Sequence, residues 1–241
     1  MSDEPPFEAD VRGIAALAEP VRRSLYDFVV RQGGPVNRDQ AAEGAGVPRH
    51  TAKFHIDKLV EDGLLEVEFN RPEGRGGPGA GRPTKYYRRG GREVAVSLPE
   101  RHYELAGRLL ARAVVDAQRD DTPVGDALRE ASFEAGQQIG THARARAGAR
   151  AGDAKLAAAS TEVLGECGYE PRADADGVTL VNCPFHVLAQ EYTELVCGMN
   201  LELMNGLVDG LERPVFAPRL DPAPGRCCVR LDAGKRGVTG S

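Results

Sequence analysis

The chain has 241 residues, of which 41% are hydrophobic and 28% are charged, and its formal net charge is -5. These values are typical of a globular protein with room for two domains of ordinary size. No apolar run approaches membrane-spanning length, and the acidic start MSDEPPFEAD lacks the apolar core of a signal peptide. We therefore expect a cytoplasmic protein without membrane contacts, whose residues 1–8 are disordered.

Two helices are predicted before residue 46. Glu19 and Pro20 mark the start of the first, whose apolar residues recur at helical spacing until the Gly33–Pro35 turn. The second is short and runs from Arg38 to Ala45, where glycines signal a turn.

A third helix is predicted after Pro48, and two strands follow it. Its inward face is apolar at helical spacing, and Gly63 ends it. Residues 65–69 then alternate between apolar residues and glutamates, which is strand periodicity. The segment 71–83 is too rich in Gly, Pro and Arg to pack, and a second strand follows around Tyr86.

The outward face of the third helix and the hairpin beyond it are basic. Between Arg49 and Arg92, ten Lys or Arg residues stand against six acidic ones, a local balance of +4 in an acidic chain. An α-helix fits the major groove of DNA, and basic side chains neutralise phosphates. The predicted DNA-binding residues are Arg49, His50, Thr51, Lys53, Phe54 and Lys58 on the helix, and Arg75, Arg82 and Lys85 on the hairpin.

Three segments of this region resemble the winged helix-turn-helix repressors of the ArsR/DeoR-like kind: LAEPVRRSLYDFV, PRHTAKFHIDKLVEDGLL and GRPTKYY. The resemblance covers roughly residues 10–96, and it implies a winged helix-turn-helix DNA-binding domain, which we assign to residues 9–96. Segment 71–83 would be the wing. The alternative is a winged helix that serves only protein contacts.

A long amphipathic helix is predicted from Pro99 to about Gln118. Its apolar positions share one face: Ala106, Leu109, Leu110, Ala113, Val114 and Ala117. In the repressors that the chain resembles, a helix in this place pairs two subunits, so residues 97–119 are expected to be the dimerisation helix of a homodimer. The same face could instead pack on the chain's own C-terminal domain.

The residues from 120 to 232 are predicted to form an α+β domain. The expected elements are helices over 124–150 and 153–167, a hairpin around Asp176-Gly177, a long helix ending near Leu211, and strands over 215–220 and 227–232. The fold class is therefore α+β, with an N-terminal winged helix-turn-helix, a central dimerisation helix and a C-terminal sensor domain.

All five cysteines lie after residue 166, and a cytosolic protein keeps them reduced. Thirteen residues separate Cys183 from Cys197 and twenty-nine separate Cys197 from Cys227, without a CxxC pair. An unbroken helix from Pro184 would place Cys197 about 20 Å from its start. A shared site therefore requires residues 185–192 to be partly a loop, with the helix proper starting near Glu191.

The order NCPFH, LVCGMNLELMNGLVDGL and CCVRL resembles the C-terminal region of SufR-type iron–sulfur repressors, and also the vinyl-reductase-type small-ligand domain. The first resemblance implies an iron–sulfur cluster (2Fe-2S or 4Fe-4S) held by Cys183, Cys197 and one residue of the Cys227–Cys228 pair. Cys227 is favoured within the pair, because neighbours in a strand face opposite ways. The fourth ligand stays open between His186, Cys228 and Cys167.

Two further interpretations of the C-terminal domain remain open. Zinc could occupy the same thiols, or the domain could hold a small organic ligand with no metal. No GxSxG, P-loop or paired-acid motif is present in the sequence. We expect a non-enzymatic transcriptional regulator, a repressor, that binds operator DNA and senses iron–sulfur or redox status.

Overall fold

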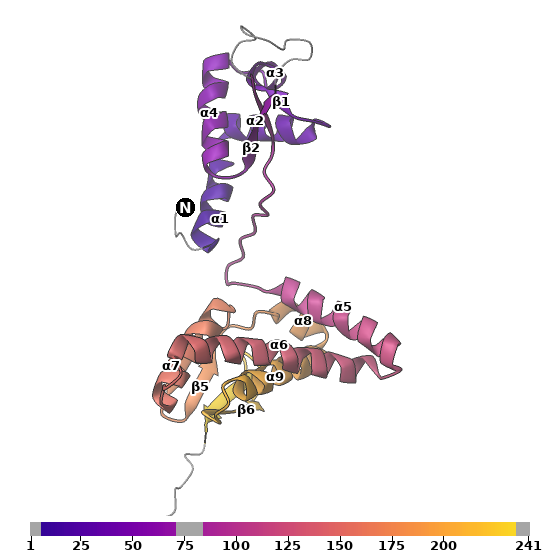
Figure 1. Ribbon diagram of the computed structural model, residues 1–241, viewed down its shortest axis with the longest axis vertical. Coiled ribbons are helices and arrows are strands. Elements are labelled where there is room, and N and C mark those ends of the chain that lie inside the picture. Colours follow the sequence, from indigo (N-terminus) through magenta and orange to yellow (C-terminus); the bar gives the residue numbers. More distant parts are fainter. Residues whose placement is uncertain (1–5, 71–83, 235–241) are drawn as a thin grey trace, which may run out of the picture. The chain divides into compact units, whose positions relative to one another are not determined.

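The computed structural model describes residues 6–70 and 84–234, which divide into two compact units with the boundary in the sequence between Val96 and Ser97 (Figure 1). Each unit has a hydrophobic core of its own. Within the described part of the chain, no helix combines the length and the apolar composition needed to cross a membrane.

The first unit joins four helices to a three-stranded sheet. Its elements are α1 (Pro6–Ala16), α2 (Pro20–Arg31), β1 (Val36–Asn37), α3 (Arg38–Gly44), α4 (Arg49–Glu61), β2 (Leu65–Asn70) and β3 (Thr84–Arg89). The strands are antiparallel in the order β1-β3-β2. The three helices and two strands predicted between residues 19 and 89 are confirmed.

Local caps fix where these helices begin and end. The Glu19 carboxylate accepts hydrogen bonds of 3.1 and 2.6 Å from two backbone N–H groups in the first turn of α2. Asn37 and Gln40 form a capping box at the start of α3. Gly46 and Gly63, with φ of 68° and 72°, adopt the left-handed conformation before and after α4.

Tyr87 joins the sheet to the helices of the first unit. It pairs with Val36 of β1 and with Val67 of β2, and it is 3% exposed. Its core neighbours include the fully buried Leu25 of α2 and Ile56 of α4. Because α4 buries this face, its opposite face is left on the surface of the unit.

Two helix starts differ from the prediction. Residues 6–8 were expected to be disordered, but α1 begins at Pro6 and is tied to the chain after β3 by an ion pair between Asp10 and Arg92. The helix expected from Pro99 begins at Tyr103, as α5. Backbone and side-chain contacts with residues 182–184 hold the preceding residues in a non-helical conformation.

The second unit packs five helices with a four-stranded sheet. Its elements are α5 (Tyr103–Asp120), α6 (Val124–Ala147), α7 (Asp153–Glu166), β4 (Pro171–Asp174), β5 (Gly177–Leu180), α8 (His186–Glu191), α9 (Thr193–Gly210), β6 (Phe216–Leu220) and β7 (Val229–Ala233). The sheet is antiparallel in the order β4-β5-β7-β6. α9 packs against β6 and β7, and α7 packs against β4. The chain is therefore α+β, as predicted.

α6 and α9 lie side by side in the second unit (Figure 1). A Cβ atom at Gly136 of α6 would lie 2.0 Å from the carbonyl oxygen of Leu203, and one at Gly206 of α9 would lie 1.9 Å from that of Phe133. The same close approach recurs one turn further along, at Gly140 and Gly210. The two helices thus run in the same direction with their backbones in contact, which only glycine permits.

The apolar face of α5 is buried within the chain. Four of its residues are at most 6% exposed and belong to the core shared with α6: Ala106, Leu109, Ala113 and Ala117. Val114 and Val115 are 44% and 61% exposed. The helix therefore packs on its own domain, as the second of the two expectations has it, and its exposed residues include Val114 and Val115.

The predicted interruption ahead of Cys197 lies at Tyr192. α8 ends just before this residue and α9 begins just after it. Cys197 consequently sits near the start of α9 instead of far along an unbroken helix. Residues 186–191 form a short helix where a partial loop was expected.

Candidate DNA-binding surface and cysteine cluster

The outward face of α4 presents basic and aromatic side chains. Arg49, His50 and Lys53 are exposed, Phe54 is 67% exposed, and Thr51 is half-buried beside them. This mixture suits the edges of base pairs in a major groove, where cations meet guanine and apolar groups meet the thymine methyl. Five of the predicted DNA-binding residues therefore share one surface.

Arg49 is paired with the helix that precedes it. Its Nε lies 2.5 Å from Oδ1 of Asp39, and the two side chains are 66% and 57% exposed. An exposed ion pair of this kind contributes about 0–1 kcal/mol to stability. Exchanging the Asp39 carboxylate for a DNA phosphate or a guanine would therefore cost little, and Arg49 remains suited to bind DNA.

Lys58 has a structural role that the sequence analysis missed. Its Nζ lies 3.1 Å from the carboxylate of Asp62 and 3.1 Å from that of Glu61. The Asp62 side chain is only 3% exposed, and a buried carboxylate needs a cation beside it. Hydrogen bonds with Asp62 and Glu61 raise the pKa of Lys58. Lys58 thus neutralises the end of α4 and is less available to DNA than Lys53.

Among the described residues of the hairpin, β3 carries three exposed cations, Lys85, Arg88 and Arg89. Lys85 of β3 is exposed and lies opposite Phe69 of β2, which is 60% exposed. Arg88 is instead engaged within the hairpin, 2.8 Å from Glu66. The predicted wing residues Arg75 and Arg82 lie outside the described residues.

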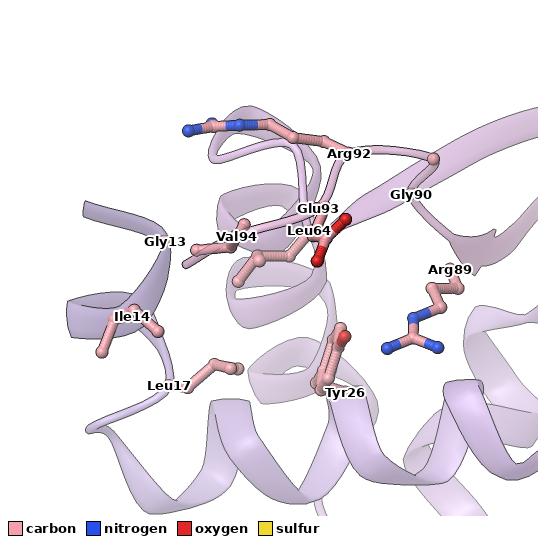
Figure 2. A pocket seen from close by; sticks show the side chains of 11 residues that line it. Gly13, Ile14, Leu17, Tyr26, Leu64, Arg89, Gly90, Arg92, Glu93 and Val94 are labelled. Carbon is pink, nitrogen blue, oxygen red and sulfur yellow. The ribbon is translucent and has the colours of Figure 1, made fainter. Parts of the chain in front are cut away.

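A pocket of about 600 Å³ opens at the other end of α4 (Figure 2). Figure 2 shows Ile14 of α1 and Leu17, which follows α1, on one side, Arg89 on the other, and Tyr26 of α2 between them. Leu64, which follows the C-terminal end of α4, also lines the pocket. The pocket therefore belongs to the region where the chain leaves β3, away from the start of α4.

Four cysteines gather near the start of α9 and just ahead of β7. The thiols interact in pairs, Cys183 with Cys227, Cys227 with Cys228 and Cys228 with Cys197, closely enough to shift the pKa values of Cys183, Cys197 and Cys227. Cys183 and Cys197 are 8% exposed, Cys227 is 2% exposed, and Cys228 is half-buried. We call these four residues the thiol cluster. It contains the three cysteines that the sequence singled out, together with Cys228.

The argument that strand neighbours face opposite ways, which favoured Cys227 over Cys228, does not apply to these two residues. Strand β7 begins at Val229, so both cysteines precede it, and Cys228 lies in a bend. Residues in a bend do not alternate as residues of a pleated strand do. The Cys227 N–H donates to the carbonyl oxygen of Leu180 at 2.8 Å, which holds the bend against β5. Both thiols can therefore join the cluster.

The other two residues weighed as a fourth ligand are His186 and Cys167. His186 begins α8 and is exposed. Cys167 follows α7 and is half-buried, and burial together with the carboxylates of Glu166 and Glu100 raises its pKa to about 11. Within the described residues, neither side chain is hydrogen-bonded to a member of the thiol cluster.

A buried polar pair reaches the cluster from α9. The Asn200 side chain donates to Sγ of Cys227 at 3.1 Å and accepts from the Tyr169 hydroxyl at 2.6 Å. Asn200 is 1% exposed and Tyr169 is fully buried. Burial raises the pKa of Tyr169 well above its ordinary value, so its hydroxyl stays a donor. Sequence reasoning missed Asn200, although it follows Cys197 by three residues and so shares its helix face.

The pKa values of Cys183, Cys197 and Cys227 are raised, which favours the protonated form of these three thiols. Interaction with the Cys227 thiol and burial place the pKa of Cys183 well above the ordinary range, and burial raises the pKa of Cys197. The interaction with Cys183 lowers the pKa of Cys227, but the interaction with Cys228 and burial bring it to about 11. A metal ion would have to displace these protons, because thiolates are the ligands.

The donor set has the chemistry of a site for a thiophilic metal. Four thiols come from three separate segments, and Asn200 donates to one sulfur, a contact that tunes iron–sulfur centres. Among the residues that the structure describes, however, no three Cys, His, Asp or Glu side chains stand where they could hold a metal ion. Metal binding would therefore require the four thiols to turn toward a common centre.

Comparison with known families matches residues 17–68 to a helix-turn-helix domain. This range contains α2, α3 and α4 with the start of β2. A search of curated proteins and of solved structures gave no significant match. The match identifies a helix-turn-helix domain in the first unit, and it supports DNA binding and transcription regulation as the chain's function.

Proposed function

We propose that the protein is a homodimeric winged helix-turn-helix repressor whose thiol cluster binds an iron–sulfur cluster and adjusts operator affinity to iron–sulfur or redox status. The observation that carries this proposal is the presence, in one chain, of a helix-turn-helix domain and four neighbouring cysteines of which three are buried. The protein would act without catalysis, through DNA contacts alone.

On DNA, α4 would enter the major groove, and the β2–β3 hairpin would follow the backbone. The residues expected at base edges or nearby phosphates are Arg49, His50, Thr51, Lys53 and Phe54, with Lys85, Arg75 and Arg82 on the hairpin and its loop. Two copies would place their recognition helices about 34–36 Å apart, one turn of DNA. The exposed Val114 and Val115 of α5 offer an apolar surface for pairing.

In the second unit, Cys183, Cys197, Cys227 and Cys228 would turn their sulfurs inward as ligands. Asn200 would keep its hydrogen bond to the sulfur of Cys227, and the surrounding apolar residues would exclude water. An iron–sulfur cluster bound there would supply a reversible electron change and sensitivity to oxidants.

The DNA-binding part is tested by Arg49→Ala and Lys53→Ala. Each variant should fold normally and lose about 5- to 150-fold in operator affinity, because a bidentate base contact is worth about 1–3 kcal/mol. Arg129→Ala, an exposed arginine of α6, is the matched control. Footprints of both α4 variants that equal the wild type would place the DNA contact elsewhere.

The sensor part is tested by iron, sulfide and zinc content after anaerobic purification, with visible absorbance. Cys183→Ser, Cys197→Ser and Cys228→Ser should each strip iron and change operator affinity, since a thiolate site depends on several converging ligands. Cys167→Ser should retain the iron of the wild type. Equal iron in all four variants and the wild type would remove the sensor hypothesis.

A groove in the second unit favours a second candidate function, a regulator that binds a small organic ligand with zinc or no metal. The groove has a volume of about 930 Å³ and is lined by Ala154, Ala157 and Ala158 of α7, with Val178 and Phe216 opposite. Mostly apolar hollows of this size hold small ligands. A colourless protein whose operator affinity changes when Ala158→Trp fills the groove would support this candidate over the first.

A further inference from the structure

The short connector between the two units is fastened beside the thiol cluster. Arg101 Nη1 donates to the carbonyl oxygen of Cys183 at 2.9 Å and also to Oδ1 of Asn182. Cys183 is the cysteine whose thiol interacts with that of Cys227. One arginine thus contacts the backbone of a cluster residue and the side chain of the residue before it.

Asn182 and His102 add further hydrogen bonds between the connector and the residues around Cys183. The Asn182 amide group donates to the carbonyl oxygens of Glu100 and Gly168 at 2.9 and 2.5 Å. The backbone N–H of His102 donates to the carbonyl oxygen of Pro184 at 3.1 Å. Asn182 is 7% exposed, so its amide group is buried with both its donor and its acceptor sides satisfied. We call the contacts of residues 100–102 with residues 182–184 the clasp.

The clasp determines at which residue the connection to the first unit leaves the second unit. The first unit ends at Val96, and α5 begins at Tyr103. With the clasp closed, residues 97–99 connect the first unit to the clasp. With it open, residues 100–102 join them, and three more extended residues add about 10 Å of reach. The two recognition helices must bind half-sites at a fixed spacing. A connector with this added reach would hold them at that spacing less well.

We propose that the clasp transmits the state of the thiol cluster to the DNA-binding unit, with Arg101 and Asn182 as its positioning residues. The proposal rests on the proposed function. When the Cys183 sulfur turns toward a bound group, that group holds the side chain of Cys183, while Arg101 holds its backbone carbonyl oxygen. Because Arg101 and His102 bind the backbone of residues 183 and 184, the connector is fixed with it. Loss of the group frees Cys183 and loosens the clasp, so the recognition helices lose their set spacing.

The test compares the full chain, metal-free or reconstituted anaerobically with iron and sulfide, as wild type, Arg101→Ala and Arg101→Lys. Arg108→Ala, an exposed arginine of α5, is the matched control. The readouts are iron content, hydrogen exchange of the His102 amide and operator affinity. In wild type and control, reconstitution should slow His102 exchange and change operator affinity. In Arg101→Ala, exchange should be about tenfold faster than in wild type, iron content should match it, and operator affinity should no longer respond to iron.

Arg101→Lys keeps the positive charge and loses the planar group that serves two acceptors, so it should fall between wild type and Arg101→Ala. An iron response of normal size in both Arg101 variants would overturn the transmission proposal and leave the sensor intact. A wild-type chain that binds no iron, or whose operator affinity ignores it, would overturn the proposed function and the transmission together.

Discussion

A Cβ atom on Gly206 would lie 1.9 Å from the carbonyl oxygen of Phe133, a distance that no side-chain carbon tolerates. α6 and α9 are therefore pressed together along their backbones. Because α9 carries Cys197 and Asn200 and α6 packs on α5, this contact joins the thiol cluster to the helix that follows the connector. Added volume therefore has little room at this contact.

Gly206→Ala should destabilise the second unit. The added methyl group must push two helix backbones apart, and overpacking of this kind costs about 1–3 kcal/mol or more. Gly198→Ala on the same helix is the control, because nothing lies within 4 Å of its added Cβ atom. That change should stabilise by up to about 1 kcal/mol, the helix-propensity difference between the two residues. Urea unfolding of both variants measures the difference, and equal unfolding free energies would contradict the backbone contact.

Tyr169→Phe should also lower the free energy of unfolding. The change removes the hydroxyl that donates to Asn200, and it leaves a buried amide oxygen without its donor. An unsatisfied buried group costs about 1–3 kcal/mol. Tyr192→Phe, at a tyrosine that is 58% exposed, should have almost no effect. The measurement is urea unfolding of the reduced, metal-free protein, and matching midpoints for the two variants would count against the buried pair.

Cys167 should make stability depend on pH in the alkaline range. Its pKa is raised from 9.0 in the ordinary thiol to about 11, mainly by burial. The unfolded chain therefore releases this proton first. The contribution of Cys167 is fully present below pH 9 and is lost as the pH rises toward 11. Stability of reduced wild type should fall more steeply between pH 9 and 11 than that of Cys167→Ser, and parallel curves would show that the thiol is not buried in solution.

Asp39→Asn should strengthen binding to the operator. The substitution releases Arg49 from its ion pair and removes one negative charge from the DNA-facing surface. Operator affinity should rise severalfold, and its log–log salt dependence should steepen by about one unit per half-site. Glu43→Gln, an exposed carboxylate on the same helix, is the control. An equal gain in both variants would assign the effect to overall charge and not to Arg49.

Local signals in the sequence predicted most of the first unit. Glu19 and Pro20, the glycine turns and the alternating strand of residues 65–69 are read over a few residues, and each lies where its signal places it. The break at Tyr192 was also predictable, since a continuous helix would have carried Cys197 away from the other cysteines. The structural role of Lys58 was missed because its partner Asp62 looks like any other surface acid until burial is known.

The remaining features depend on contacts between distant segments. The bend at Cys227 and Cys228 follows from where β7 starts to pair, which a strand pattern does not reveal. The glycine contact between α6 and α9 has a signature in the sequence, because the glycines of each pair, Gly136 with Gly140 and Gly206 with Gly210, are spaced four residues apart. Such spacing only becomes informative once the two helices are known to be neighbours. The clasp carries no such pattern, since Arg101 and Asn182 are eighty-one residues apart.

The placement of the thiol cluster along the chain sets an order of events during synthesis. The first unit ends at Val96, and 132 further residues must be added to reach Cys228. At about 5–20 residues per second this takes roughly 7 to 26 s, and domains fold as units from the N-terminus. On the proposed function, each new subunit thus has a finished DNA-binding unit before its four sulfurs can meet. Each subunit therefore lacks a sensor site at first. Repression that requires the bound group can begin only after the strand that follows Cys228 has been synthesised.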